Sequence, residues 1–218
     1  KGLRIAWSAD LGYAPVAPEI AQHCAKAARV FADLGATLDE AHPGFADPQH
    51  AIDMIWACGM HATLGSYLPH SADKLDAGLL NWLKSALGYS AADYAQALVT
   101  RASLWERNRQ FFDRSTPSGY DLLITPTMPT TAFAALPKEP NQIEGRAVTG
   151  FGYTPLTYPF NLTGQPAATV PCGFAADGLP IGLQIIGRRY DDATVLRACA
   201  AFEAARPWAQ HLPAMCRA

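Results

Sequence analysis

The serine side chains are the first candidates for chemistry, because a nucleophilic serine needs a base beside it and backbone N–H donors around it. The chain contains no Gly-x-Ser-x-Gly turn, and none of its serines lies in a glycine-rich segment that would expose the hydroxyl. Ser71 and Ser90 are instead predicted to cap helices. The serines are Ser8, Ser66, Ser71, Ser85, Ser90, Ser103, Ser115 and Ser118. The sequence therefore shows no self-sufficient nucleophile arrangement.

The six histidines and five cysteines show no paired metal-ligand spacing. Cys58 and His61 lie three residues apart in a predicted helix, but a metal site would need two further ligands. The chain has no Cys-x-x-Cys pair and no glycine-rich phosphate loop. We therefore expect no metal and no cofactor, and free thiols in a reducing compartment. The cysteines are Cys24, Cys58, Cys172, Cys199 and Cys216.

Composition argues against several classes of function. The net charge is −2, and no Lys/Arg run is present, so nucleic-acid binding is not expected. No apolar run approaches the ~20 residues of a membrane span. The first residues, Lys1–Ile5, resemble neither a signal nor a transit peptide, so we expect a cytoplasmic location. Only 17% of the residues are charged, against about 25% in typical domains, which fits a surface that is partly covered.

The first forty residues predict a strand, a helix and a second strand. Leu3–Trp7 has a strand pattern, a helix is expected between Pro18 and Gly35, and Ala36–Leu38 resembles the next strand. The helix carries one apolar stripe, formed by Ile20, Cys24, Ala27, Phe31 and Leu34. Such a βαβ unit implies a parallel strand pair with a right-handed crossover.

The middle of the chain is predicted to be helical. Two helices are expected over residues 48–67 and 71–87, and a third follows a capping box formed by Ser90 and Asp93. The third helix is expected to bury a face made of Tyr94, Leu98, Ala102, Trp105 and Phe112. It also carries Arg101, Arg107, Arg109 and Arg114, which we interpret as a solvated, salt-bridged face in preference to a binding patch.

The last third of the chain predicts further strands. Asp121–Thr125 is expected to be buried, and Ala167–Pro171 pairs with Ile181–Ile186 through the turn at Asp177-Gly178. Both hairpin strands are almost entirely apolar, which favours the sheet centre. A final helix is expected between Asp191 and Pro207.

A long segment rich in Pro, Gly and Thr, from Met128 to Thr157, has little periodicity. It is either the wall of a functional site or a structural surface loop, and the sequence favours neither. Asn161 is expected to fix a backbone turn, and Gln184 is expected to be hydrogen-bonded in the core.

Several segments occur in an order that closely resembles the C-terminal part of the amidase signature family. They are Phe160–Ala167, Val170-Pro171, Gly178–Gly187 and the helix from Asp191 to Glu203, preceded by the weaker matches Gly2–Trp7 and Tyr120–Thr127. The family includes fatty acid amide hydrolases, bacterial amidases and the A subunit of glutamyl-tRNA amidotransferase. The resemblance implies that residues 1–218 are the C-terminal portion of a single amidase domain. The implied fold class is α/β, with a mixed β-sheet flanked by helices on both sides.

The family's catalytic apparatus, a lysine and two serines, belongs to the first half of its domain. No lysine of this chain lies in the matching context, so the resemblance assigns no catalytic residue here. It implies a Ser-Ser-Lys mechanism in which a neutral lysine is the base, a bridging serine relays the proton and the second serine attacks the amide carbonyl. Backbone N–H groups would bind the oxyanion, and water would hydrolyse the acyl-enzyme without a metal or cofactor.

Thr154 and Thr157 are the candidate substrate-binding residues. In family members that use glutamine, an acidic residue stands just before a Thr-x-x-x-Asn run, and Thr154 occupies the matching position upstream of Thr157 and Asn161. This departure argues against glutamine as the substrate. A small-molecule amide is the expected partner.

Three hypotheses remain open. The chain is part of an amidase whose triad lies elsewhere, or a non-catalytic amidase-like binding or structural module, or, least favoured, another Ser/His hydrolase. The first implies that the chain alone is inactive. A sheet that lacks the strands of the other half of the domain would expose an unpaired edge strand. We therefore also expect homo-oligomers or self-association.

Overall fold

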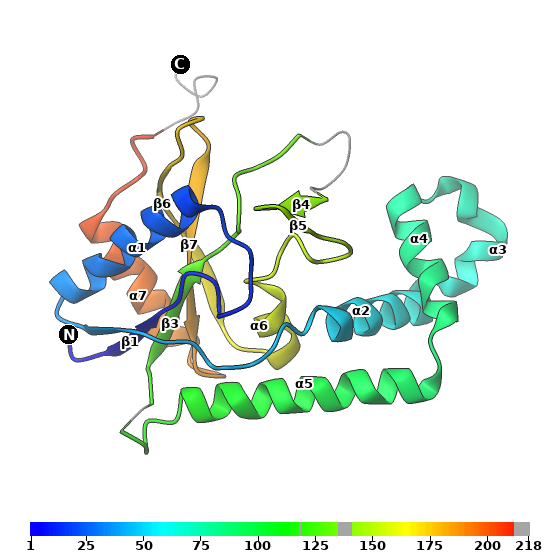
Figure 1. Cartoon of the computed structure of the whole chain (residues 1–218), viewed down its shortest axis with the longest axis horizontal. Coiled ribbons are helices and arrows are strands. Elements are labelled where there is room, and N and C mark those ends of the chain that lie inside the picture. The colour runs from blue at the N-terminus through cyan, green and yellow to red at the C-terminus, as the bar shows by residue number, and fades with distance from the viewer. Residues whose placement is uncertain (118, 135–140, 212–218) are drawn as a thin grey trace.

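The computed structural model describes residues 1–117, 119–134 and 141–211 (Figure 1). Its centre is a five-stranded sheet in the order β2-β1-β3-β7-β6. Strands β1 and β3 run parallel to each other and to β2, while β7 is antiparallel to both β3 and β6. The strands are β1 (Arg4–Trp7), β2 (Thr37–Glu40), β3 (Leu122–Pro126), β6 (Ala167–Phe174) and β7 (Pro180–Gly187). The predicted mixed α/β sheet is confirmed.

Helices cover both faces of this sheet, as predicted. Helices α1 (Pro18–Asp33) and α7 (Asp192–Ala205) pack on one face, and α6 (Tyr158–Thr163) and α5 (Ala91–Phe111) pack on the other. Alternation along the strands directs neighbouring side chains to opposite cores. In β3, Leu122 and Ile124 join the α1/α7 core, whereas Leu123 joins the α5/α6 core.

The predicted βαβ unit at the N-terminus is present. Helix α1 begins at Pro18, and the chain leaves it through Gly35 at a φ of +89°, a conformation that glycine adopts without strain. The parallel register of β1 and β2 pairs Arg4 with Thr37. Phe31 of α1 stacks on Phe202 of α7 with ring centroids 5.7 Å apart, so the two helices share one core.

The helices after β2 depart from the prediction. Helix α2 (Gln49–Leu64) matches. The helix expected over 71–87 is shorter, forming α4 (Ala77–Ser85) between two 3-10 turns, and a separate short helix α3 (Leu68–Ser71) precedes it. Ser71 ends α3 and its side chain caps nothing. Asp76 caps α4 instead, by accepting hydrogen bonds from Gly78 N and Leu79 N, because Leu75 adopts an extended conformation that ends the preceding turn.

Helix α5 starts with the predicted capping box, in which Ser90 and Asp93 bond reciprocally. Its predicted apolar face is wrong apart from Phe112, which closes the helix and is buried. The buried residues within α5 are Ala97, Leu104 and Asn108, which form a neighbouring stripe, whereas Leu98 is 39% and Trp105 37% exposed. Figure 1 shows the reason: much of α5 extends past the sheet, where it lies beside α2. Only the narrow stripe formed by Ala97, Leu104 and Asn108 is therefore buried against neighbouring elements.

The C-terminal hairpin pairs as predicted, but only β7 lies in the interior of the sheet. Strand β6 is an edge strand in the described part of the chain, and half of its residues are exposed. Apolar composition alone cannot separate these two positions. None of the helices in the described residues is long and apolar enough to span a membrane.

Candidate functional site

The carboxyl ends of the parallel strands β1 and β3 are where an α/β sheet usually binds ligands. Here they are followed by residues 8–16 and 127–134, and beside them lies the segment 141–157, which we call the wall. The wall contains the hairpin β4 (Gln142–Ile143) and β5 (Arg146–Ala147), and it leads into α6 (Figure 1). It is the second part of the predicted Met128–Thr157 segment, of which residues 135–140 lie outside the described residues.

The wall is fixed to the sheet by Gln184 of β7. This side chain is 4% exposed, and its Nε2 donates to the carbonyl oxygen of Leu156 at 2.8 Å and to Thr125 Oγ1 at 3.0 Å. The prediction that Gln184 is hydrogen-bonded in the core is confirmed. A buried amide with two such bonds is costly to disrupt, so it sets the position of the wall's C-terminal end.

A second anchor is the loop that follows β1. Tyr13 Oη donates to the carbonyl oxygen of Pro155 at 2.6 Å, and Arg146 Nη1 donates to the carbonyl oxygen of Tyr13 at 3.0 Å. The same loop therefore holds the wall at its hairpin and at the turn before α6.

A third anchor is formed by helix α2 together with Trp82 of α4. Asp53 Oδ1 accepts from Phe151 N at 3.1 Å, and the Phe151 ring lies edge-on to Trp56 and stacks on Trp82, at centroid distances of 5.3 Å and 5.2 Å. Gln49 Nε2 donates to the carbonyl oxygen of Thr149. Three sets of contacts thus tie this part of the segment to the rest of the fold, while its residues 144–147 remain exposed.

Three buried or half-buried titratable groups around the wall, Tyr13, Asp53 and Tyr158, have raised pKa values. Burial raises the pKa of Tyr13 and of Tyr158, and the carboxylate of Asp47, which accepts a hydrogen bond from Tyr158 Oη, adds to both shifts. Burial also raises the pKa of Asp53, although its hydrogen bonds from Phe151 N and Gln49 oppose this. The two phenols thus remain hydrogen-bond donors at neutral pH. Such groups can position a ligand but do not supply a nucleophile.

Thr154 and Thr157, the predicted substrate-binding residues, both lie half-buried in the turn at the C-terminal end of the wall, directly before α6. Thr154 Oγ1 donates to the carbonyl oxygen of Phe151 at 2.9 Å, and Thr157 Oγ1 donates to that of Thr154 at 3.1 Å. The structure therefore brings them together, and each oxygen can still accept a hydrogen bond. Asn161 is exposed on α6, and its side chain makes no hydrogen bond with the described residues, contrary to the expected backbone tie.

A hollow of about 300 Å³, which was not predicted, lies between α1, the residues after β3, and strands β6 and β7; the lining residues that the structure describes include none from the wall. It is lined by residues that follow β3, including Met128, Thr131 and Phe133, and by Thr169 of β6. Thr127 and Thr169 share a hydroxyl–hydroxyl hydrogen bond of 2.6 Å, and the ring of Phe133 lies edge-on to Tyr153 of the wall at 6.0 Å. The available sequence signal was the Thr- and Pro-rich run directly after a buried strand, at 125–131.

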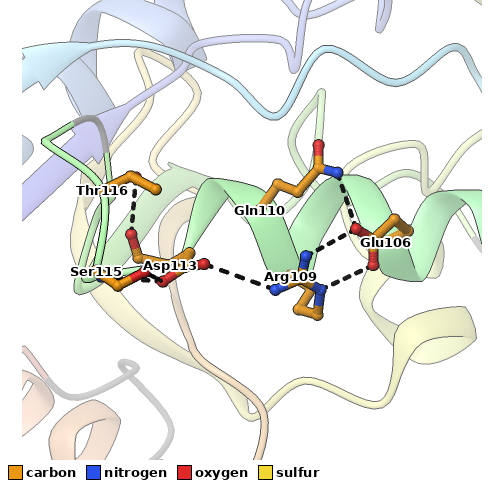
Figure 2. A network of polar contacts seen from close by, with 6 residues as sticks. All are labelled: Glu106, Arg109, Gln110, Asp113, Ser115 and Thr116. Carbon is orange, nitrogen blue, oxygen red and sulfur yellow. Dashed lines mark hydrogen bonds and ion pairs between the residues drawn. The ribbon is translucent and has the colours of Figure 1, made fainter.

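Two arginines of α5, Arg101 and Arg109, make contacts within the protein. Figure 2 shows Arg109 between Glu106 and Asp113, with Gln110 also bonded to Glu106. Hydrogen bonds from Arg109 and Gln110 lower the pKa of Glu106 to about 2. Arg101 Nε donates to the carbonyl oxygen of Leu162 at 2.7 Å and so ties α5 to α6.

Metal ligands do not gather in the described part of the chain, where no three His, Cys, Asp or Glu side chains could hold an ion together. Of the predicted candidates Cys58 and His61, His61 uses Nδ1 in a 2.9 Å hydrogen bond with the carbonyl oxygen of Leu83. Ser118, Lys138 and Cys216 lie outside the described residues.

Comparison with known proteins agrees with the resemblance of the motifs. The sequence profile of the amidase family, described as "Amidase", matches residues 1–196. The chain belongs to the amidase signature family. An acylamidase of Rhodococcus erythropolis is 36% identical to this amidase chain over 217 residues, which is 98% of the chain and 44% of the relative. The A subunit of glutamyl-tRNA(Gln) amidotransferase of Geobacillus stearothermophilus is 40% identical over 128 residues, which is 59% of the chain and 24% of that relative.

The fold comparison gives the same result. The crystal structure of a bacterial aryl acylamidase, itself an amidase signature enzyme, superposes with a TM-score of 0.84 and 30% identity, covering 97% of this chain and 45% of its own. A 6-aminohexanoate cyclic dimer hydrolase has the same fold, with a TM-score of 0.79 at 24% identity. The chain thus spans about half the length of the acylamidases it matches.

Proposed function

We propose that the protein hydrolyses a carboxylic amide to an acid and ammonia or an amine, through a Ser-Ser-Lys acyl-enzyme mechanism whose catalytic residues lie outside these 218 residues. The observation that carries this proposal is the match to an acylamidase over 98% of the chain. It is supported by the lack of a nucleophile arrangement among the serines of the sequence.

The role proposed for this chain is that of the C-terminal portion of one amidase domain. It supplies five strands of the sheet and the wall of the substrate pocket, with Thr154 and Thr157 contacting the substrate. The aromatic and aliphatic side chains near the hollow, among them Met128 and Phe133, favour an apolar acyl or aryl group. Thr154 in place of an acidic residue disfavours glutamine.

Two further parts of the proposal concern the cellular compartment and the self-association of the chain. We place the protein in the cytoplasm, and the unpaired state of Cys24, Cys58, Cys172 and Cys199 supports a reducing compartment. We also propose that the isolated chain self-associates through β6, whose edge is open in the described residues. Light scattering that shows a clean monomer at high concentration would contradict the proposed self-association.

The function is tested on the intact protein, meaning the full polypeptide that carries these residues. It is assayed for release of amine from aryl and alkyl acylamides. We expect Thr154→Val and Thr157→Val to raise KM several-fold with a smaller change in kcat. Thr100→Val, which removes a similar half-buried hydroxyl that donates to a backbone carbonyl on α5, is the matched control and should leave KM unchanged. Absence of amidase activity in the intact protein would favour the non-catalytic module, and an unchanged KM in both wall variants would exclude the pocket role.

A further inference from the structure

Two cysteines that are distant in sequence meet between α1 and β6. Cys24 lies on the inner face of α1 and is completely buried, and Cys172 is half-buried in β6. Their sulfur atoms are 3.8 Å apart across a sequence separation of 148 residues. Neither the hydrolysis proposed above nor the wall uses this pair.

The backbone at Cys172 is irregular. The pairing of β6 with β7 shifts register between Pro171 and Gly173, so Cys172 is the extra residue of a β-bulge. Bulges bend a strand and redirect a side chain, which here places the sulfur against α1. A bulged edge strand also moves more easily than a regular central one.

The Cys172 side chain is reachable from solvent. It lines a hollow of about 470 Å³ between α1, β6 and the residues after α7, together with His23, Lys26 and His211. The hydrogen bond between the two sulfurs lowers the pKa of Cys172 and raises that of Cys24. Cys172 is therefore the more accessible thiol and the one that forms a thiolate more readily, while Cys24 is buried behind it.

We propose that Cys24 and Cys172 are an oxidation site, a dithiol that a peroxide converts into an intramolecular disulfide. The Cys172 thiolate attacks one peroxide oxygen, the O–O bond breaks and hydroxide leaves, which gives a sulfenic acid. The Cys24 sulfur then attacks Cys172, the S–O bond breaks, and the Cys24 proton leaves with the oxygen as water. Two thiols are oxidised and one hydrogen peroxide is reduced, in all, to two waters.

Formation of the disulfide requires a small movement of the two sulfur atoms toward each other. A disulfide has an S–S length of about 2.05 Å, so the sulfurs must approach by somewhat less than 2 Å. The bulge at Cys172 can absorb this shift, because Cys172 itself has no partner in β7, whereas Pro171 and Gly173 on either side remain paired. Cys58 in α2 and Cys199 in α7 show no comparable sulfur neighbour among the described residues and serve as internal references.

The experiment treats the folded intact protein with hydrogen peroxide, then unfolds, alkylates and digests it for mass spectrometry. We expect a peptide pair linked through Cys24 and Cys172 that is lost on reduction, while Cys58 and Cys199 are alkylated as in the untreated protein. Full alkylation of Cys24 and Cys172 after peroxide, or a link from Cys172 to another cysteine, would overturn the proposal.

Variants with a single cysteine substitution separate formation of the sulfenic acid at Cys172 from formation of the disulfide. In Cys24→Ser the disulfide cannot form, so Cys172 should accumulate as a sulfenic acid that dimedone traps. Cys199→Ser is the matched control and should give the same link as the unmodified protein. If dimedone labels Cys199 but not Cys172 in the Cys24→Ser protein, the assignment of Cys172 as the reacting thiol is wrong.

Discussion

The sheet region and the helical arm formed by residues 49–111 are stabilised in different ways. In the sheet region, two clusters of buried apolar side chains fill both faces of the sheet. The arm has one small cluster, formed by Ala51, Met54 and Ala97, and still exposes large side chains such as Trp56 and Val99. Burial therefore holds the sheet region. The arm joins this burial only through a few residues such as Ile52 and Leu104, and it adds helix caps and short-range ion pairs at its surface (Figures 1 and 2).

The comparison matters for function because the wall joins the two regions. Its C-terminal end is bonded to Gln184 in the sheet, and its centre is held by Asp53, Trp56 and Trp82 in the arm. Local opening of the arm can thus shift segment 141–157 without affecting the sheet core.

The largest difference is expected between two leucines. Leu123 of β3 is fully buried, so Leu123→Ala should lower the free energy of unfolding by about 2–5 kcal/mol. Leu98→Ala, on the exposed side of α5, should cost less than about 1 kcal/mol. Urea unfolding measures both, and equal losses would break the distinction between the regions.

The next effect concerns the anchor in the sheet. Gln184→Ala leaves the Leu156 carbonyl without its donor and creates a small cavity, so we expect a loss of about 1–3 kcal/mol. Gln210→Ala removes an exposed glutamine with one backbone bond and should change stability by less than about 0.5 kcal/mol. A Gln184 variant as stable as the Gln210 variant would show that the wall does not depend on this bond.

A smaller, local effect is expected in the arm. Ser90→Ala removes the capping box of α5 and should cost about 1 kcal/mol, seen as faster amide hydrogen exchange in the first turns of α5. Ser103→Ala, at an exposed position inside the same helix, is the control and should leave exchange almost unchanged. Faster exchange in β3 as well would mean that the arm and the sheet unfold together.

The smallest expected effects are changes in stability with pH, and they have opposite signs for Glu106 and Asp53. The pKa of Glu106 is lowered from 4.5 to about 2, so its stabilising effect is present above pH 4.5 and is lost as the pH falls toward 2. The pKa of Asp53 is raised, so its effect favours folding at low pH and is lost as the pH rises through the raised value. Between pH 7 and pH 3, Glu106→Gln should therefore reduce the acid loss of stability and Asp53→Asn should increase it. A change in the same direction in both variants would contradict the two assignments.

Much of the sheet was predictable because its signals are local. Pro18 and Gly35 bound α1, and Asp177-Gly178 specifies the turn between β6 and β7. The buried face of α5 was not predictable, since the choice between the Leu98 stripe and the Leu104 stripe depends on where α2 and α6 pack. The edge position of β6 likewise follows from sheet order and not from composition.

The site was predictable only in outline. The sequence located a segment up to Thr157 and the buried Gln184, but not that the two are joined through the Leu156 carbonyl. The contacts of Tyr13 with Pro155 and of Asp53 with Phe151 cross 142 and 98 residues, and no local pattern encodes them. The Cys24–Cys172 pair was missed for the same reason.

The central claim is that the acyl-enzyme serine lies outside these 218 residues while this chain forms the pocket wall. Labelling the intact, active protein with a fluorophosphonate, followed by peptide mapping, tests it most directly, because the reagent modifies an activated serine. The account predicts that activity is lost as one serine outside residues 1–218 is labelled. Loss of activity with the label on a serine within this chain, such as Ser8, would contradict it.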